Sequence, residues 1–357
     1  MKIIRRHLAR EIFASTALVL IAFLALFAFF DLVYELESIG RGGYQLHHAI
    51  VFVALSLPGR VYELIPIAVL IGAMYGLTTL ARHSEITVLR ASGLSTGNIV
   101  LSLVRVGLAF ALITFVFGEF VAPPAEKSAR QLKLSATSAA VAQEFRSGLW
   151  VKDDPYFVNV RTVLPDLSLR NIRLYEFDST MVLRSISDAE RGQFKAPDTW
   201  QLANVVQTRF EANRASVVNL PELSWRSTLT PEMVSVVMVV PEKMSAVSLV
   251  SYLRHLMENR QATERFELAL WKKLVYPLAS IVMLILALPF AYLQDRMGAV
   301  SIKVFIGVML GIGFHMANGL FSSLGLINNW PPVLSAFAPS VLFLLIASGM
   351  LWWVDRR

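Results

Sequence analysis

The chain has 357 residues, of which 55% are hydrophobic and only 17% are charged, and it contains no cysteine. A formal charge of +7 is what a nucleic-acid-binding protein could carry, but most of the basic surplus lies beside apolar runs, where it sets membrane topology, and this argues against nucleic-acid binding. The lack of cysteine excludes a disulfide framework and a thiolate metal site, and it permits an exported domain.

Six apolar runs follow one another as candidate membrane spans, each near the roughly 20 residues that cross a bilayer. They cover about residues 12–33, 59–81, 99–121, 269–293, 301–327 and 333–354. The second span is expected to be longer, because residues 47–58 continue into it through Pro58 and Gly59, a natural kink. The first run is too long for a signal peptide and no cleavage site closes it, so we expect a retained helix.

Basic residues in the short connections predict the orientation. They occur in the N-terminal tail, in the connection 81–98 and at the C-terminus, as Lys2, Arg5, Arg6, Arg10, Arg82, Arg90, Arg356 and Arg357. Both termini and this connection are therefore expected to be cytoplasmic. The chain would then divide into three parts, with spans 1–3 in residues 1–121, an extracytoplasmic insert in residues 122–268 and spans 4–6 in residues 269–357.

The insert replaces apolar runs by short alternating segments, such as residues 156–163, 171–177 and 216–220. Alternation punctuated by Asp-Pro, Leu-Pro-Asp and Ala-Pro-Asp indicates half-buried strands joined by turns. Seven to nine strands are expected, which suits a sandwich or jelly roll of about 110 residues. Residues 248–274 are expected to be helical. The predicted fold is an α-helical polytopic membrane protein with an inserted all-β, jelly-roll-like domain.

Motifs for catalysis are missing from the sequence. There is no GxxxxGK[ST] phosphate loop, no HExxH, CxxC or GxSxG, and the six histidines are scattered. We expect no catalytic residue, no metal site and no cofactor in this chain, so energy for any transport must come from a partner. An inverted-repeat transporter is a weaker alternative, since no matched pair of Gly/Pro-broken spans is visible.

The polar connection 81–98 predicts a short cytoplasmic helix between two spans. Ser84 can cap its start, Glu85 lies in the favourable first turn, and Ile86 and Leu89 share one face. A partner protein could grip such a helix. The plain alternative is that Glu85 only complements the helix dipole, an effect of about 0.3–1 kcal/mol.

The run HSEITVLRASGLS resembles the coupling helix, about residues 83–93, of the LptF/LptG family of lipopolysaccharide export permeases. Four further runs resemble this family in the same order along nearly the whole chain: GEFVAPPAEKSAR at 118–130, SGLWVKDD at 147–154, LTPEMVSVV at 229–237 and LWKKLVYPLASIVMLILALPF at 270–290. The GLW run favours the LptG branch of the family over the LptF branch.

The resemblance implies a noncatalytic subunit of an ABC exporter in the inner membrane of a Gram-negative bacterium. Its partners would be a cytoplasmic ATPase dimer, which holds ATP and Mg, and a second, LptF-like permease. The complex would extract lipopolysaccharide and pass it to a periplasmic jelly-roll bridge protein of the LptC/LptA kind. Two alternatives stay open: an LptF-like paralogue, and a membrane-anchored β-domain scaffold or sensor without transport.

The same resemblance assigns roles to individual residues. Glu85, Ile86, Leu89 and Arg90 would form the surface that couples to the ATPase. Lipid phosphates would be met by cations near the outer ends of the spans, Arg130, Lys133, Lys273 and Arg41.

Arg130 and Lys133 are three residues apart, so on a continuing helix they face one side at headgroup height. Ordinary interfacial anchoring by snorkelling is the alternative for these cations. It is also the alternative for Lys272 and Lys273 beside Trp271.

Asp31, Glu35 and Glu37 depart from the family pattern, because some members carry lysines along this stretch. Three explanations are open. The lipid phosphates are met by other cations, a divalent cation bridges them to the carboxylates, or the carboxylates are simply solvated at the interface.

Overall fold

The structure is a computed structural model of the chain. It describes residues 2–40, 43–83, 85, 96–137, 148–153, 155–163, 168–178, 180–195, 198–211, 214–227, 241–258, 261–292 and 300–356. By the density of internal contacts the chain forms two compact units. The first, called the helical body, consists of Met1–Tyr34, Val53–Glu126 and Glu264–Arg357, and the second, called the strand-containing unit, consists of Glu35–Phe52 and Lys127–Thr263.

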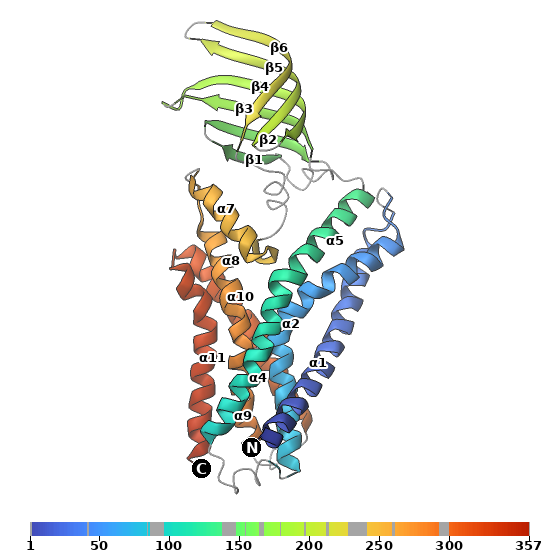
Figure 1. Ribbon diagram of the computed structural model, residues 1–357, viewed down its shortest axis with the longest axis vertical. Helices are drawn as coiled ribbons and strands as arrows, with labels where there is room; N and C mark the ends of the chain where they lie inside the picture. Colours follow the sequence, from blue (N-terminus) through green and yellow to red (C-terminus); the bar gives the residue numbers. More distant parts are fainter. Residues whose placement is uncertain are drawn as a thin grey trace. The chain divides into compact units, whose positions relative to one another are not determined.

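Six helical segments of the described chain are long and apolar enough to cross a membrane, which confirms the predicted number of spans (Figure 1). They are α1 (Lys2–Leu36), α2 (Leu46–Arg82), α4 (Thr96–Val116) with η1 (Phe117–Val121) and α5 (Ala122–Thr137), α8 (Glu264–Val275) with η4 (Tyr276–Leu278) and α9 (Ala279–Tyr292), α10 (Val300–Ile327), and α11 (Pro332–Asp355). As expected, α2 starts well before residue 59 and runs through Pro58.

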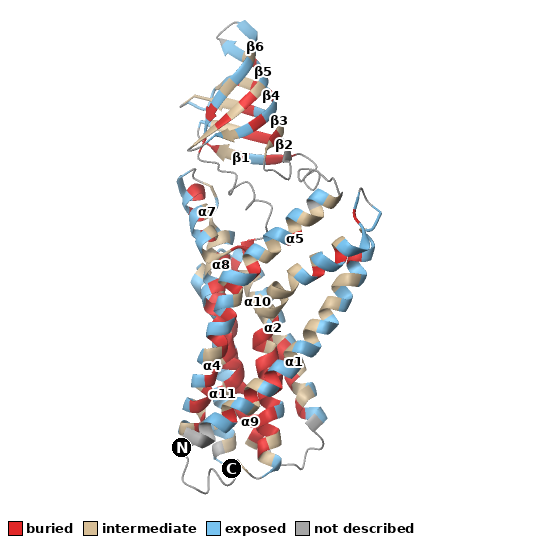
Figure 2. Cartoon of the chain, turned by 45° about the vertical axis from the view of Figure 1, so that its right-hand side comes forward, coloured by how far each residue is buried: buried red, intermediate tan, exposed pale blue. Residues whose placement is uncertain are grey.

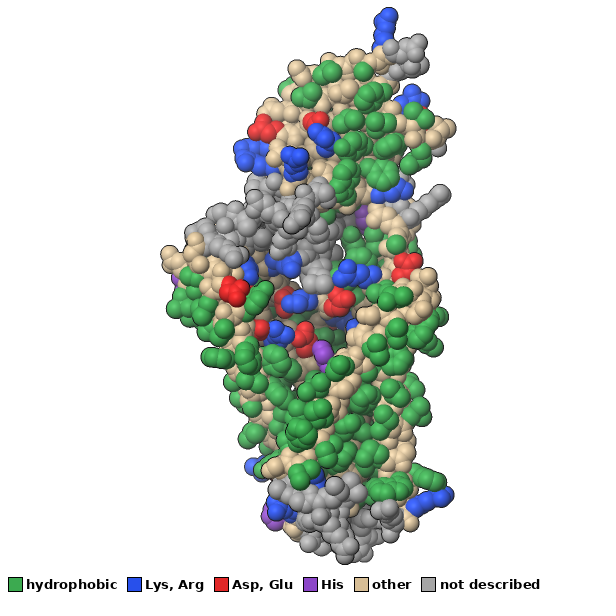
Figure 3. Space-filling view, turned by 180° about the vertical axis from the view of Figure 1, so that it is seen from behind, with side chains coloured by type: hydrophobic (Ala, Val, Ile, Leu, Met, Phe, Trp, Pro, Cys, Tyr) green, Lys and Arg blue, Asp and Glu red, His purple; other side chains and the backbone are tan. Residues whose placement is uncertain are grey.

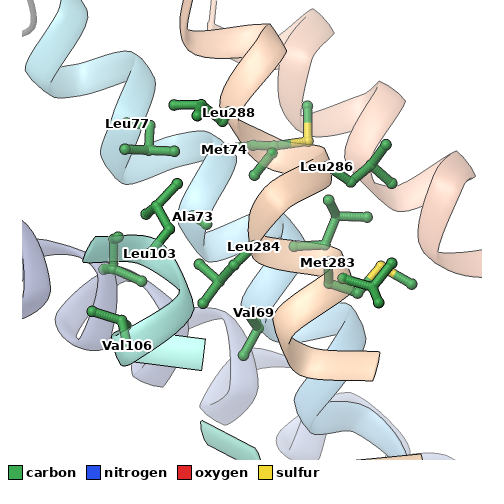
Figure 4. Close-up of a cluster of buried hydrophobic side chains, with 14 of the residues drawn as sticks. Val69, Ala73, Met74, Leu77, Leu103, Val106, Met283, Leu284, Leu286 and Leu288 are labelled. Carbon is green, nitrogen blue, oxygen red and sulfur yellow. The ribbon is translucent and has the colours of Figure 1, made fainter. Parts of the chain in front are cut away.

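The core of the helical body lies among α2, α4 and α9, where buried residues concentrate (Figure 2). Eleven of the 14 residues of α9 are buried, so this helix is central to the body. Figure 4 shows Val69 and Ala73 of α2, Leu103 of α4, and Met283 and Leu284 of α9 in this cluster. On the face seen in Figure 3, hydrophobic side chains dominate the outside of the body as well, as expected of helices in lipid.

Small residues allow close approach of helices inside the body. A Cβ at Gly72 of α2 would lie 2.5 Å from the Cα of Thr16 of α1, and a Cβ at Gly107 of α4 would lie 3.0 Å from the Cα of Ile281 of α9. In lipid, van der Waals packing at such small-residue contacts drives helix association, because lipid tails are as apolar as the side chains.

The third span contains a π-helical turn. Residues Phe117–Val121, the segment η1, join α4 to α5 without a break in the helix. Gly118 lies in this turn, and a Cβ there would be 2.5 Å from Cε2 of Tyr62. The glycine therefore lets the turn approach the ring of Tyr62 on α2.

The insert contains one antiparallel sheet of six strands in sequential order, which confirms a β domain inserted between the helices. The strands are β1 (Leu149–Asp153), β2 (Tyr156–Val163), β3 (Leu169–Phe177), β4 (Leu183–Lys195), β5 (Thr199–Glu211) and β6 (Arg214–Arg226), followed by η3 (Pro241–Lys243) and α7 (Ala246–Glu258). Residues 138–147 and 228–240 lie outside the described chain. The predicted seven to nine strands exceed the six described ones, because β4, β5 and β6 each run for 13 residues.

One face of the sheet is apolar and carries the buried cluster that includes Val158, Ile172 and Trp200; we call the opposite side the polar face. On β3, β4 and β5, every second residue points to the apolar face, as in a regular strand. Each of these strands has one exception, where two such residues are three positions apart: Leu169 and Ile172 on β3, Ala189 and Gly192 on β4, and Leu202 and Val205 on β5.

The spacing of three marks a crease that crosses the sheet. Asn171 and Asn204 have positive φ angles of 52° and 54° there, and Pro221 lies at the same level of β6. Register is unchanged on both sides, as Val160↔Ile172 and Thr162↔Arg170 show, so no residue is inserted. The crease places two consecutive residues of β3, of β4 and of β5 on the polar face.

Candidate functional site

The acidic residues near the end of α1 pair with cations of neighbouring helices. Arg60 of α2 donates to both carboxylate oxygens of Asp31, from Nη2 to Oδ1 at 2.7 Å and from Nε to Oδ2 at 3.0 Å. Its Nη1 donates to Glu63 at 3.3 Å, and its guanidinium carbon lies 5.4 Å from the ring centroid of Phe27. Because a two-pronged Arg–carboxylate pair fixes geometry as well as charge, Asp31 ties α1 to α2.

Glu35 is the centre of a second, more buried network in the strand-containing unit. Its side chain is only 4% exposed, and it accepts hydrogen bonds from Nζ of Lys133 at 2.7 Å and from the hydroxyl of Tyr44 at 3.1 Å. Nζ of Lys133 also lies 5.0 Å from the ring centroid of Phe52. Burial, together with the neighbouring Glu35 carboxylate, raises the pKa of Tyr44, so the phenol stays protonated and keeps donating.

These contacts bear on the three explanations for the acidic stretch. In this structure Asp31 and Glu35 meet cations of the protein itself, while Glu37 is exposed. Among the described residues, no group of three or more His, Cys, Asp or Glu side chains could hold a metal ion. Two of the three carboxylates are therefore paired with cations of the protein.

Arg130 and Lys133 both lie on α5, as their spacing predicts. Lys133 is held by Glu35, whereas Arg130 is half-buried and makes no hydrogen bond or ion pair with any described residue. The two predicted phosphate-binding cations thus differ in this structure, one engaged and one available.

Lys273 lies inside the helical body. The residue is only 7% exposed, and its Nζ lies 5.9 Å from the ring centroid of Tyr62. Tyr62 packs on Tyr276 at 5.0 Å between centroids, and Glu119 of η1 is close enough to attract the ammonium. A snorkelling lysine would keep its charge in water, so this placement does not fit simple interfacial anchoring.

Glu85 lies at the start of the predicted coupling helix. Its Oε2 is 3.1 Å from Nε2 of His7 on α1, and both side chains are about half-exposed. Ser84, Ile86, Leu89 and Arg90 lie outside the described residues, and so does Arg41. The structure therefore describes the predicted ATPase-coupling surface only at Glu85.

Sequence reasoning missed Arg60, Glu63 and Tyr44. Arg60 has a usable signal, because an ionisable residue inside an apolar run is a candidate functional residue by default. Its position at the edge of the span expected over 59–81 hid this signal, since the helix in fact starts at Leu46. Tyr44 has no signal in the sequence, because only the fold brings it to Glu35.

Comparison with known proteins agrees with this architecture. The profile of the family described as "Lipopolysaccharide export system permease LptF/LptG" matches residues 6–353. The chain is 30% identical over 358 residues to the lipopolysaccharide export system permease protein LptG of Escherichia coli K12. This alignment covers 99% of this chain and 98% of that protein. The chain is 28% identical over 353 residues to the protein of the same name from Haemophilus influenzae, with the same shares of the two chains covered.

The family match covers all six spans and the sheet, and the relatives carry the LptG name, so the predicted preference for the LptG branch is confirmed. The six apolar helices agree with a multi-pass protein of the inner membrane. The chain belongs to the LptF/LptG family of lipopolysaccharide export permeases.

Proposed function

We propose that this chain is the noncatalytic permease subunit of an ABC exporter that extracts lipopolysaccharide from the inner membrane. A cytoplasmic ATPase dimer with ATP and Mg would supply the energy, an LptF-like permease would complete the cavity, and an LptC/LptA-like bridge would receive the lipid. Both termini would be cytoplasmic, and the sheet would be periplasmic.

The observation that carries the proposal is the pair of cations on α5, in the strand-containing unit. Lys133 is held by Glu35, and Arg130 has no partner among the described residues. Phosphate oxygens accept charge-assisted hydrogen bonds from such groups. A phosphorylated lipid could bind Arg130 directly, and it would compete with Glu35 for Lys133.

Burial of the spans supports a second membrane partner. In the most apolar stretch of each helix, only 17% of the residues of α1 and of α10 are buried, whereas 78% of the residues of α2 are buried. In the exporter, the exposed apolar sides of α1 and α10 would meet the second permease and the acyl chains of the substrate.

Coupling to the ATPase is assigned to Glu85. Its carboxylate is half-exposed and meets only a half-exposed histidine in the described chain, so it is accessible to a basic group of a partner. Rearrangement of α1 would follow from the same contact, because His7 belongs to that helix.

The test is affinity purification of the tagged chain from mildly solubilised membranes, with mass spectrometry and an ATPase assay on the eluate. We expect an ABC ATPase, a second six-span permease and lipopolysaccharide, and we expect Glu85→Lys to uncouple ATP hydrolysis from lipid export. Glu258→Lys, which reverses an exposed carboxylate of α7, serves as the control. Recovery of the chain alone, without ATPase activity, would favour the anchored scaffold instead.

The lipid contact is tested by photo-crosslinking of lipopolysaccharide to Arg130→Gln and Lys133→Gln. We expect less crosslinking in both variants. Arg265→Gln, which removes an exposed cation of α8, is the control and should leave the crosslinking unchanged. The double variant Glu35→Gln, Lys133→Gln separates lipid contact from loss of the ion pair. Unchanged crosslinking after removal of both charges would contradict the assignment.

A further inference from the structure

A hollow of about 510 Å³ lies on the polar face of the sheet, over β1 to β4. Two rows of side chains line it. One row crosses the sheet from Trp150 through Asn159 and Arg173 to Asp188, which are successive register partners. The other row lies in the crease and includes Arg161 and Glu190. This volume falls within the range of about 300–1,000 Å³ that small-molecule sites occupy.

The crease forms one wall of the hollow. Asn171, one of its two left-handed residues, lines the hollow directly. The other, Asn204, donates to Oε2 of Glu190 at 2.8 Å, and this bond orients the carboxylate. Left-handed residues inside strands cost free energy and persist where the surrounding structure holds them. The wall of the hollow is therefore formed by a defined backbone conformation and a hydrogen-bonded carboxylate, and not only by loosely spaced surface side chains.

Aromatic rings lie on the other side of the hollow. Trp150 of β1 is 53% exposed, and its ring stacks on that of Tyr175 of β3, with 5.7 Å between centroids and 20° between planes. Both rings line the hollow. A pair of stacked rings, of which Trp150 is exposed, offers a rigid apolar platform that the C–H face of a sugar ring can cover.

The polar groups of the hollow can both donate and accept hydrogen bonds. Arg161 makes no hydrogen bond or ion pair with a described residue, so its five N–H donors are available. Arg173 and Asp188 hold each other, with 2.5 Å between Nε and Oδ1, and both keep further polar atoms for a ligand. Two cations and two carboxylates line the hollow, so it carries no excess of either charge.

We propose that this hollow binds an oligosaccharide, with one sugar ring against Trp150 and hydroxyls of this and neighbouring rings on Arg161, Arg173 and Glu190. The polar lining disfavours an acyl chain, and the balanced charge gives no general attraction for a phosphate. Hydroxyl groups, which donate and accept, match the mixed set of donors and acceptors. That the saccharide is the sugar portion of lipopolysaccharide rests on the proposed function; the affinity of the hollow for sugar does not.

The experiment measures binding to the full chain in nanodiscs free of lipopolysaccharide. The probe is fully deacylated lipopolysaccharide, which keeps the sugars and lacks the acyl chains, and the readouts are saturation-transfer NMR and calorimetry. We expect the wild-type chain to bind the probe and Trp150→Ala to bind it about five- to tenfold more weakly. Arg161→Gln should weaken binding by a similar factor, and enzymatic removal of the phosphates should change the affinity less than twofold.

Matched controls come from the same sheet. Phe210→Ala removes a part-exposed ring of β5, and Arg214→Gln removes an exposed cation of β6, and both lie away from the hollow. Their affinities should equal that of the wild-type chain. Amide exchange across the sheet identifies any variant that has lost its fold, and Trp150→Phe, which keeps a ring, should then retain most of the affinity.

Three results would overturn the proposal. The first is no binding of the probe by the wild-type chain, and the second is equally weakened binding in the control variants. The third is loss of binding after dephosphorylation of the probe, which would mean that the chain recognises the phosphates at a site other than the hollow. The proposed function fails on different results, because it predicts ATPase association and lipid export. A chain that exports lipid but ignores the deacylated probe refutes only the saccharide site.

Discussion

The helices and the sheet of this chain are stabilised by different contacts. Where α1 crosses α2, Gly72 faces the backbone of Thr16, whereas Gly192 of the sheet faces the ends of the Ile172 and Leu202 side chains. The charged pairs differ as well, since Glu35 is buried and the Arg173–Asp188 pair is half-exposed on both sides. The same type of substitution should therefore have larger effects in the helices than in the sheet.

The largest effect is expected at the crossing of α1 and α2. Gly72→Ala would force the helix backbones apart, because its Cβ would lie 2.5 Å from the Cα of Thr16, a backbone atom that cannot move alone, and overpacking of this kind costs about 1–3 kcal/mol or more. We expect loss of the folded chain from detergent extracts, measured by size-exclusion chromatography. Gly192→Ala, which meets only side-chain ends, should remain folded. Equal loss in both would remove the contrast between helices and sheet.

The next effect concerns the two ion pairs. Glu35→Ala leaves Lys133 and Tyr44 without their acceptor. We expect it to lower the free energy of unfolding by about 2–4 kcal/mol, which is less than for a fully buried pair because the Lys133 side chain is one-third exposed. Asp188→Ala should cost at most about 1 kcal/mol, because exposed pairs are screened by water. Denaturant unfolding of the two variants decides the point, and similar losses would contradict it.

The crease gives a smaller, local effect. Asn171→Val places a β-branched residue at a φ of 52°, and we expect a loss of about 1–2 kcal/mol, with Asn171→Gly close to the wild-type stability. The control is Asn219→Val on β6, an outward asparagine without positive φ, which should be neutral or stabilising. Thermal unfolding compares the three. A harmless Asn171→Val would mean that the crease relaxes easily.

The smallest effect is a pH dependence in the turn between β3 and β4. Hydrogen bonds from the Thr180 hydroxyl and from the Val182 backbone N–H lower the pKa of Asp178 to about 2. Because the folded pKa lies below the unfolded value of about 3.9, the turn is stabilised above that value and loses this stabilisation as the pH falls towards 2. The protection factors of the Thr180 and Val182 amides, which divide out the intrinsic pH dependence of exchange, should fall over this window. In Asp178→Asn they should not change with pH there, and a variant that behaves like the wild-type chain would refute the prediction.

The six spans could be predicted because a membrane helix needs only length and apolarity, and both can be read from the sequence. The strands were harder to predict for a definite reason. The two-residue alternation breaks at Asn171, Asn204 and Pro221, so a reader of the sequence starts or ends strands there. The segments 171–177 and 216–220 stop at this level, although β3 and β6 continue past it.

The charged site could be predicted only in part. Arg130 and Lys133 were assigned from the family resemblance, and the local spacing correctly places both on one helix, α5; their predicted contact with lipid stays a prediction. The ion pairs were not predicted, because Lys133 and Glu35 are 98 residues apart, and Arg60 and Asp31 are 29 apart. Pairing across helices depends on tertiary packing, and no local pattern specifies it. Resemblance to relatives did not help here, because the acidic stretch is where this sequence departs from them.

The π-helical turn η1 has a consequence for the phase of the third span. An α-helix turns by about 100° per residue, and a π-turn accommodates one additional residue without ending the helix. If the same residues formed a uniform α-helix instead, everything after the turn would be rotated by about that angle. Glu126, whose carboxylate now lies against Gly59 of α2, would then point elsewhere. The π-turn thus sets which side chains of α5 this span presents to α2.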